Sequence, residues 1–123
     1  MSEIEQEVDL LAIAKQVQKS RIGHSFLRGP NDGYEVSAGY RMDSTRESLD
    51  NLTRLRNRMI EKGETETTIR DFDNQFHGVS EEELTGIIGE LTDFGLSLYQ
   101  HKWELENMID AAETVEAVEL VNW

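Results

Sequence analysis

The spacing of apolar residues predicts an amphipathic helix at the start of the chain. Ile4, Val8 and Leu11 recur at helical intervals, and further apolar residues stand beside them. Acidic residues come early in this stretch and basic residues late, an order that complements the helix dipole. We expect a helix over residues 3–20. An irregular segment over residues 21–33 should follow, because it contains the turn sequence Gly29-Pro30-Asn31-Asp32-Gly33.

A pattern of period two follows this turn. Tyr34, Val36, Ala38 and Tyr40 alternate with polar or small residues, which is typical of a half-buried strand. We therefore expect one strand over residues 34–41.

A second helix is predicted after this strand. Asp43 or Ser44 is expected to cap it, since Ser44-Thr45-Arg46-Glu47 has the spacing of a capping box. Gly63 is suited to end it as a C-cap. The apolar stripe of this helix consists of Leu49, Leu52, Leu55 and Met59.

Two short strands are expected next. Thr65, Thr67, Ile69 and Phe72 suggest one strand, and Phe76 with Val79 suggests another. Asp73-Asn74 could join the two as a hairpin.

The longest helical pattern covers residues 81–111 and begins with a second capping box, Ser80-Glu81-Glu82-Glu83. Gly86, Gly89 and Gly95 each weaken this helix by about 1 kcal/mol relative to Ala. We interpret them as places where another helix or strand approaches closely. Thr114 is expected to cap a last short helix that carries Val115, Val118 and Val121.

These elements predict an α+β fold. A small antiparallel sheet is combined with an N-terminal helix, a middle helix, a long C-terminal helix and a short terminal helix. The length of 123 residues is that of a single domain over 1–123. Within it, residues 1–32 form an N-terminal helix and loop.

Charge is unevenly distributed along the chain. The net charge is −13, and residues 62–123 carry 15 acids but only Lys62, Arg70 and Lys102 as bases. Such a surface repels nucleic acid and attracts a basic protein, although an acidic face also serves solubility alone. No apolar run reaches the length of a membrane span, and the acidic N-terminus is unlike a signal peptide. We expect a cytosolic protein that binds neither nucleic acid nor membrane.

No residue pattern points to catalysis. Cysteine is absent, which excludes disulfides and thiolate chemistry. The histidines His24, His77 and His101 are too far apart for a helical metal pair. Residues 71–82 resemble a calcium loop only by chance, because Phe76 stands where such a loop needs glycine. We expect no enzyme activity, no metal and no cofactor.

The candidate interface residues are basic or aromatic. Arg54 and Arg58 belong to a basic cluster on the second helix, for which a solvated face or a pairing with the acidic C-terminal helix of the same chain is favoured, and an inter-subunit contact comes second. Tyr99 and Trp103 are four residues apart on the long helix and can touch. For Trp103 a place in the core is favoured over an interface. Trp123 is expected to pack onto the domain.

The C-terminal segment contains Trp103-Glu104-Leu105, then Ile109-Asp110-Ala111-Ala112-Glu113-Thr114-Val115-Glu116, and the closing Trp123. This pattern resembles the C-terminal signature of a small bacteriophage tail-associated family of uncharacterised function. Weaker matches upstream include Gly39-Tyr40-Arg41-Met42-Asp43-Ser44, Arg70-Asp71-Phe72-Asp73-Asn74 and Ser80 through Leu84, so that residues 33–123 are family-like.

The resemblance implies a non-enzymatic protein that binds other tail proteins of the fibre or baseplate, either in the virion tail or as an assembly helper in the host cytoplasm. A homo-oligomer is compatible with this role. The alternative is an acidic phage-encoded inhibitor that mimics nucleic acid to block a host protein.

Overall fold

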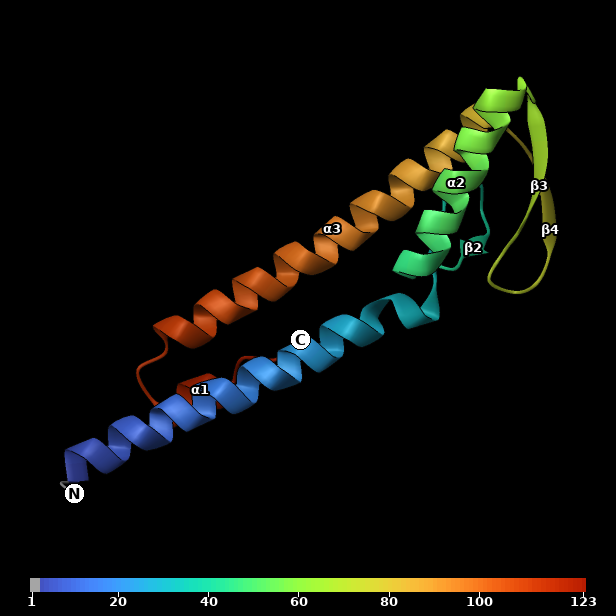
Figure 1. Ribbon diagram of the computed structural model, residues 1–123. Coiled ribbons are helices and arrows are strands. Elements are labelled where there is room, and N and C mark those ends of the chain that lie inside the picture. The colour runs from blue at the N-terminus through green and yellow to red at the C-terminus, as the bar shows by residue number, and fades with distance from the viewer. Residues whose placement is uncertain (1–2) are drawn as a thin grey trace. The chain divides into compact units, whose positions relative to one another are not determined.

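The computed structural model describes the backbone of residues 3–123 and the side chains from residue 10 onward (Figure 1). The fold is α+β, as predicted, with helices and two separate two-stranded antiparallel sheets. The elements in chain order are α1 (Glu3–Arg28), a 3-10 turn (Gly29–Asp32), β1 (Tyr34–Glu35), β2 (Arg41–Met42), α2 (Arg46–Lys62), β3 (Glu66–Arg70), β4 (Phe76–Ser80), α3 (Glu81–Ala111) and α4 (Val115–Glu119).

The first helix is longer than the sequence predicts. Residues 21–28 are helical, so the expectation of an irregular segment over 21–33 is wrong for this part. Burial explains the extension, because Ile22 is only 2% exposed and lies in a hydrophobic core. The helix ends before Pro30, which cannot supply the backbone N–H that a further turn requires.

The predicted strand over residues 34–41 is a tight hairpin instead. Its two-residue strands pair Tyr34 with Met42 and Glu35 with Arg41. The chain reverses between them, since the Val36 N–H donates to the Tyr40 carbonyl and Gly39 adopts a φ of 97°. The apolar alternation still has a structural meaning, because Val36 is buried and Tyr34 and Tyr40 pack against the same core.

The cap of α2 differs by one residue from the predicted capping box. Thr45 is the N-cap, and its Oγ1 accepts a hydrogen bond of 3.3 Å from the Ser48 N–H. The Ser44 hydroxyl instead donates to the Pro30 carbonyl. The C-cap at Gly63 is confirmed, with a left-handed φ of 68°.

The second hairpin and the long helix match the prediction. β3 and β4 are antiparallel, with Ile69 opposite His77, and Asn74 in the connecting turn has a φ of 64°. Ser80 caps α3, because the Glu83 N–H donates to its Oγ at 3.0 Å. Thr114 caps α4 in the same way, by accepting from the Ala117 N–H at 3.1 Å.

Contacts divide the chain into two compact units. The hairpin unit (Pro30–Leu96) contains both sheets, α2 and the first part of α3. Its core consists of Val36, Met42, Met59, Ile69, Val79, Leu84, Ile87, Ile88 and Leu91.

The helical unit (Met1–Gly29 with Ser97–Trp123) contains α1, the last part of α3 and α4. Its core brings together one residue of α1, two of α3, one of α4 and one of the tail that follows. They are Ile22, Leu105, Ile109, Val118 and Val121.

The glycines of α3 do not mark close contacts. A methyl group at Gly86, Gly89 or Gly95 would meet nothing within 4 Å outside the local helix backbone, so the expected close approach is wrong. Among residues 3–123, no helix has the length and apolar character that crossing a bilayer requires.

Candidate protein-binding surface

Exposed aromatic side chains gather on the helical unit. Tyr99 and Trp103 lie one turn apart on α3, with ring centroids 5.7 Å apart, so the predicted contact between them is confirmed. Trp103 is 54% exposed, and the expectation that it belongs to the core is wrong. The reason is helical geometry: Leu105 faces the core, and two residues correspond to a rotation of about 200° around the helix.

Phe26 of α1 and Trp123 complete the group. The Phe26 ring lies 4.6 Å from Tyr99 and 6.3 Å from Trp123, between ring centroids. Trp123 also meets His101 edge to face at 4.6 Å. The prediction that the terminal tryptophan packs onto the domain is therefore confirmed. We call Phe26, Tyr99, His101, Lys102, Trp103 and Trp123 the aromatic surface.

Hydrogen bonds fix the elements that carry this surface. The buried Gln18 amide donates to the Val121 carbonyl at 2.6 Å, which ties the C-terminal segment to α1. The ammonium group of Lys15 donates to the Asp110 carbonyl at 2.8 Å, and Lys19 forms a salt bridge with the Asp110 carboxylate. These contacts hold together α1, α3 and the C-terminal tail, the three segments that carry the aromatic side chains.

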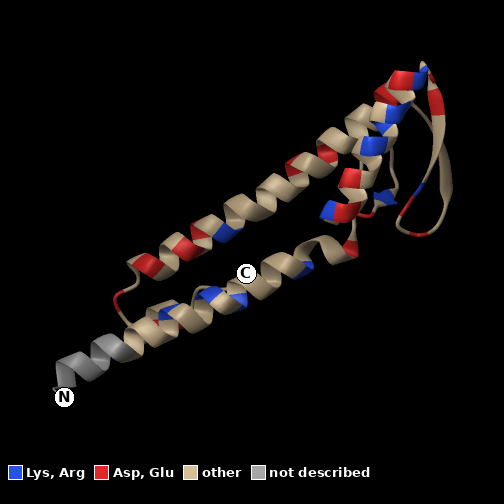
Figure 2. Ribbon diagram, viewed as in Figure 1, with Lys and Arg blue, Asp and Glu red and all other residues tan. Residues whose placement is uncertain are grey.

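The helical unit that carries the aromatic surface has charges of both signs, with six acids and five bases from residue 10 onward. Lys102 is the only base after Arg70, and its Nζ lies 4.9 Å from the centre of the Phe26 ring, a cation–π distance. The next charged residues in the α3 sequence are Glu104 and Glu106, and Figure 2 shows several acidic positions along α3. An apolar centre with a charged rim is the usual layout of a protein interface.

Arg54 and Arg58 lie in the hairpin unit, on the exposed side of α2. Arg58 pairs with Glu61 one turn further along at 3.3 Å. Arg54 forms no ion pair with any side chain from residue 10 onward. Both positions agree with a solvated helix face.

A polar cluster organises the turn between β3 and β4. One oxygen of the buried Asp71 carboxylate accepts the N–H groups of Asp73 and Gln75, and the other lies 2.7 Å from the His77 Nε2. The Tyr40 ring stacks on His77 with centroids 3.7 Å apart. The hydrogen bond with His77, followed by that from Gln75, holds the pKa of Asp71 below its usual value.

This cluster is a structural turn. Within residues 10–123, no three acidic or histidine side chains are placed to hold a metal ion. Both oxygens of Asp71 are engaged by neighbouring protein groups. The turn explanation of the sequence that resembles a calcium loop is confirmed by these hydrogen bonds.

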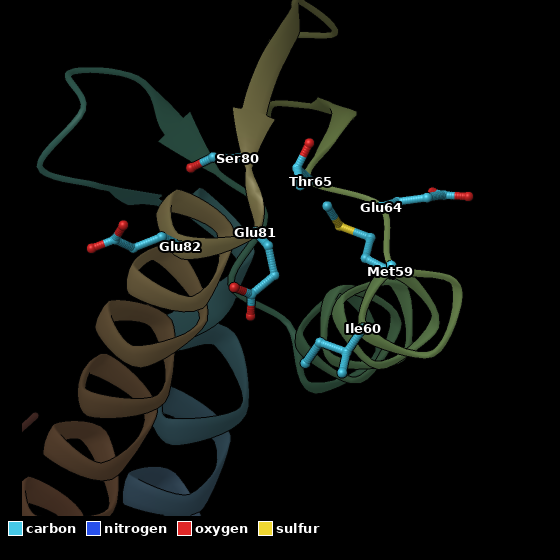
Figure 3. Close-up of a pocket in the computed structure, with 8 residues that line it drawn as sticks. Met59, Ile60, Glu64, Thr65, Ser80, Glu81 and Glu82 are labelled. Atoms are coloured by element: carbon cyan, nitrogen blue, oxygen red, sulfur yellow. The ribbon is translucent and has the colours of Figure 1, made fainter.

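One open pocket of about 410 Å³ lies between the end of α2 and the start of α3 (Figure 3). Its apolar part is Met59 and Ile60, and its carboxylates are Glu64, Glu81 and Glu82. Glu81 is hydrogen-bonded to the Thr85 hydroxyl. Thr65 and Ser80 also line the pocket, and the Ser80 hydroxyl is engaged as the cap of α3, so the pocket is an open, negatively charged surface.

Sequence reasoning missed Phe26, His101 and Lys102. A signal for Phe26 existed, because it stands four residues after Ile22 and continues the same helical face. Phe26 falls within the irregular segment expected over residues 21–33, so this spacing does not enter the prediction. His101 and Lys102 join the surface only through contacts with Trp123 and Phe26, which sequence spacing does not reveal.

No curated protein and no solved structure matches the chain. The sequence profile of a domain of unknown function, DUF4376, matches residues 5–122. Since the match covers the helical unit and the hairpin unit almost completely, the chain belongs to the DUF4376 family.

Proposed function

We propose that this chain is a non-enzymatic bacteriophage tail protein that acts by binding other tail proteins of the fibre or baseplate. The observation that carries the binding role is the aromatic surface. Tyr99, Trp103 and Trp123 are 41%, 54% and 37% exposed, yet they are held in contact with one another or with their neighbours. The assignment to a phage tail is supported by the resemblance of residues 33–123.

Ordered aromatic side chains are well suited to this role. Tryptophan and tyrosine dominate the binding energy of protein interfaces, since they bury a large area and lose little conformational entropy. Here Tyr99 and Trp103 are restrained before any partner arrives, which lowers the entropic cost of association. The neighbouring acids favour a partner whose rim is basic.

The acidic-inhibitor alternative is less well supported. A mimic of nucleic acid needs a continuous row of negative charge, because DNA carries one charge per about 1.7 Å of its axis. α3 has no acid between Asp93 and Glu104, a gap of about 16.5 Å along the helix. The aromatic residues Tyr99 and Trp103 occupy this gap.

The test combines particle composition with affinity capture. Mass spectrometry of purified phage particles determines whether the chain is a stoichiometric tail component. Tagged chain is then used to capture tail proteins from infected cells. Trp103→Ala is expected to reduce capture of a fibre or baseplate protein by about tenfold or more.

Met108→Ala is the matched control, because Met108 is equally exposed on α3 but about 140° around the helix from Trp103. Capture should survive this change. Absence from the particle together with failure to capture any tail protein would overturn the proposal. Capture of a host DNA-binding protein that DNA displaces would favour the acidic inhibitor.

A further inference from the structure

One face of α1 carries mostly apolar side chains and faces solvent. Residues at successive three- and four-residue steps form a straight row along the helix, and every one is exposed. We call this the outer row, and it consists of Leu10, Ile13, Val17, Ser20, His24 and Leu27. The four apolar side chains are 44% to 69% exposed. Single exposed apolar residues are ordinary, but a row at heptad spacing is the pattern of a helix that packs on another helix.

The outer row is distinct from the face that α1 uses inside its own unit. Leu11, Ala14 and Ile22 pack into the core of the helical unit, with Gln18 hydrogen-bonded beside them. α1 therefore carries apolar residues on two faces. A helix at the surface of a protein normally has one apolar face, and its opposite face is polar.

The order of charges along α1 favours one relative orientation of two packed copies of this helix. The helix carries four acids followed by four bases, with no mixing of the two. They are Glu3, Glu5, Glu7 and Asp9, then Lys15, Lys19, Arg21 and Arg28. Two parallel copies would place like charges together, but two antiparallel copies place the acidic segment of each beside the basic segment of the other.

The same antiparallel arrangement also pairs the apolar residues at the middle of the outer row. α1 has 26 residues and is about 39 Å long, so full overlap puts the twofold axis near residue 15. Ile13 of one copy then lies opposite Val17 of the other, and residues 3–9 lie opposite residues 21–27. Lys15 and Lys19 bind Asp110 within their own chain, whereas Arg21 and Arg28 are exposed beside the outer row.

We propose that the outer row of α1 binds the outer row of a second copy of this chain, in an antiparallel, twofold-symmetric dimer. Such an interface is self-complementary, as closed dimers require. A lipid surface is a poorer occupant, because the acidic segment would meet anionic headgroups. The proposal does not depend on the proposed tail function, and the aromatic surface remains available to a different partner.

The solution mass of the intact chain tests the dimer. Light scattering coupled to size exclusion, and sedimentation equilibrium, should give twice the chain mass of 14.1 kDa. Val17→Glu should weaken self-association by about tenfold or more, since it buries an unpaired charge at the axis. Leu120→Glu is the matched control, because Leu120 is 81% exposed in the same unit but off the outer row. Circular dichroism should show that both variants are folded.

Charge reversal and cross-linking test the orientation. Arg21→Glu with Arg28→Glu should weaken the dimer, and mixing this variant with a chain whose acids at positions 3, 5, 7 and 9 are lysine should restore it. Because the chain has no cysteine, Leu10→Cys and Ser20→Cys give unambiguous cross-links. A mixture of the two should cross-link, whereas each alone should not.

Three results would overturn the proposal. The wild-type chain could be monomeric at high concentration, or Val17→Glu could leave the dimer intact. Ser20→Cys could cross-link to itself, which would require parallel helices or a twofold axis near residue 20, and either contradicts the proposed register. If the monomer instead co-sediments with phosphatidylglycerol vesicles and Val17→Glu abolishes this, the outer row is a membrane-binding face. A monomer that still captures tail proteins through Trp103 would refute the dimer and leave the proposed function standing.

Discussion

The Asp71 carboxylate closes the turn between β3 and β4 by accepting three hydrogen bonds while it is buried. Hydrogen bonds to the ionised form favour ionisation, which is why the pKa of Asp71 lies below its ordinary value. The pKa of the Tyr40 phenol is shifted upward instead. Burial is the largest cause, and the nearby charge of Glu83 is the second. The charge of Asp71 is therefore part of the folded state.

Asp71→Asn should lower stability in a pH-dependent way. A carboxylate with a depressed folded pKa stabilises the protein above its unfolded pKa of about 3.8, and this contribution is lost as the pH falls through the lower folded value. Urea denaturation should show wild type more stable than the variant at pH 7, with the difference vanishing at strongly acid pH. Asp73→Asn, at an exposed position in the same turn, should change little. A difference of constant size at every pH would contradict this account.

At the scale of elements, the β1–β2 hairpin depends on Gly33. Its φ is +73°, and a Cβ there would lie 2.8 Å from the Met42 carbonyl oxygen and 2.8 Å from the Arg41 side chain. The second strand thus comes too close for any side chain at this position.

Gly33→Ala is expected to cost about 1–3 kcal/mol, because it combines a left-handed backbone with a clash. Gly39→Ala is the comparison, since Gly39 also has a positive φ but a Cβ there meets nothing within 4 Å. Thermal denaturation should rank Gly33→Ala as the more damaging change. Equal losses would show that backbone strain alone decides the outcome.

The elements that the sequence predicts well are those with local signals. α2, α3 and α4 are marked by capping residues and helical periodicity, and the β3–β4 hairpin by its turn. α1 continues past its predicted end because burial of Ile22 stabilises the helix over residues 21–28. That burial depends on tertiary contacts, and residues 21–28 contain no local signal that starts or stops a helix. The reversal of the chain between β1 and β2 is not predicted, because the alternation of apolar and polar residues over 34–41 continues through the turn.

The candidate surface was predictable only in part, for a similar reason. The contact between Tyr99 and Trp103 follows from their spacing on one helix. Phe26 reaches Tyr99 from the other end of the chain, and such a contact leaves no trace in local spacing. Trp103 has the size and apolar character of a core residue, and only the positions of Leu105 and Ile109 reveal that it faces outward.

At the scale of the molecule, two cores share one helix. α3 contributes Leu84, Ile87, Ile88 and Leu91 to the core of the hairpin unit. It contributes Leu105 and Ile109 to that of the helical unit. Each core is contiguous within its own unit, so local opening of either can be measured separately.

Ile109→Ala should destabilise the helical unit selectively. Ile109 is fully buried, and its truncation is expected to cost about 2–5 kcal/mol. Hydrogen exchange should show reduced protection in α1 and α4 and unchanged protection in β3 and β4. Leu84→Ala, which is equally buried in the other core, should give the reverse pattern. A uniform loss of protection in both variants would mean that the chain opens as one cooperative unit.

The three unobstructed glycines of α3 make the chain easy to stabilise for laboratory use. Ala at Gly86, Gly89 or Gly95 removes conformational freedom from the unfolded chain without creating a clash, and each change should add about 0.4–1 kcal/mol. The triple variant should melt at a higher temperature and keep its wild-type surface of charged and aromatic side chains. A lower melting temperature would contradict the reading of these sites as open. If the variant behaves as expected, it supplies a stiffened reagent for crystallisation and for capturing weakly bound partners.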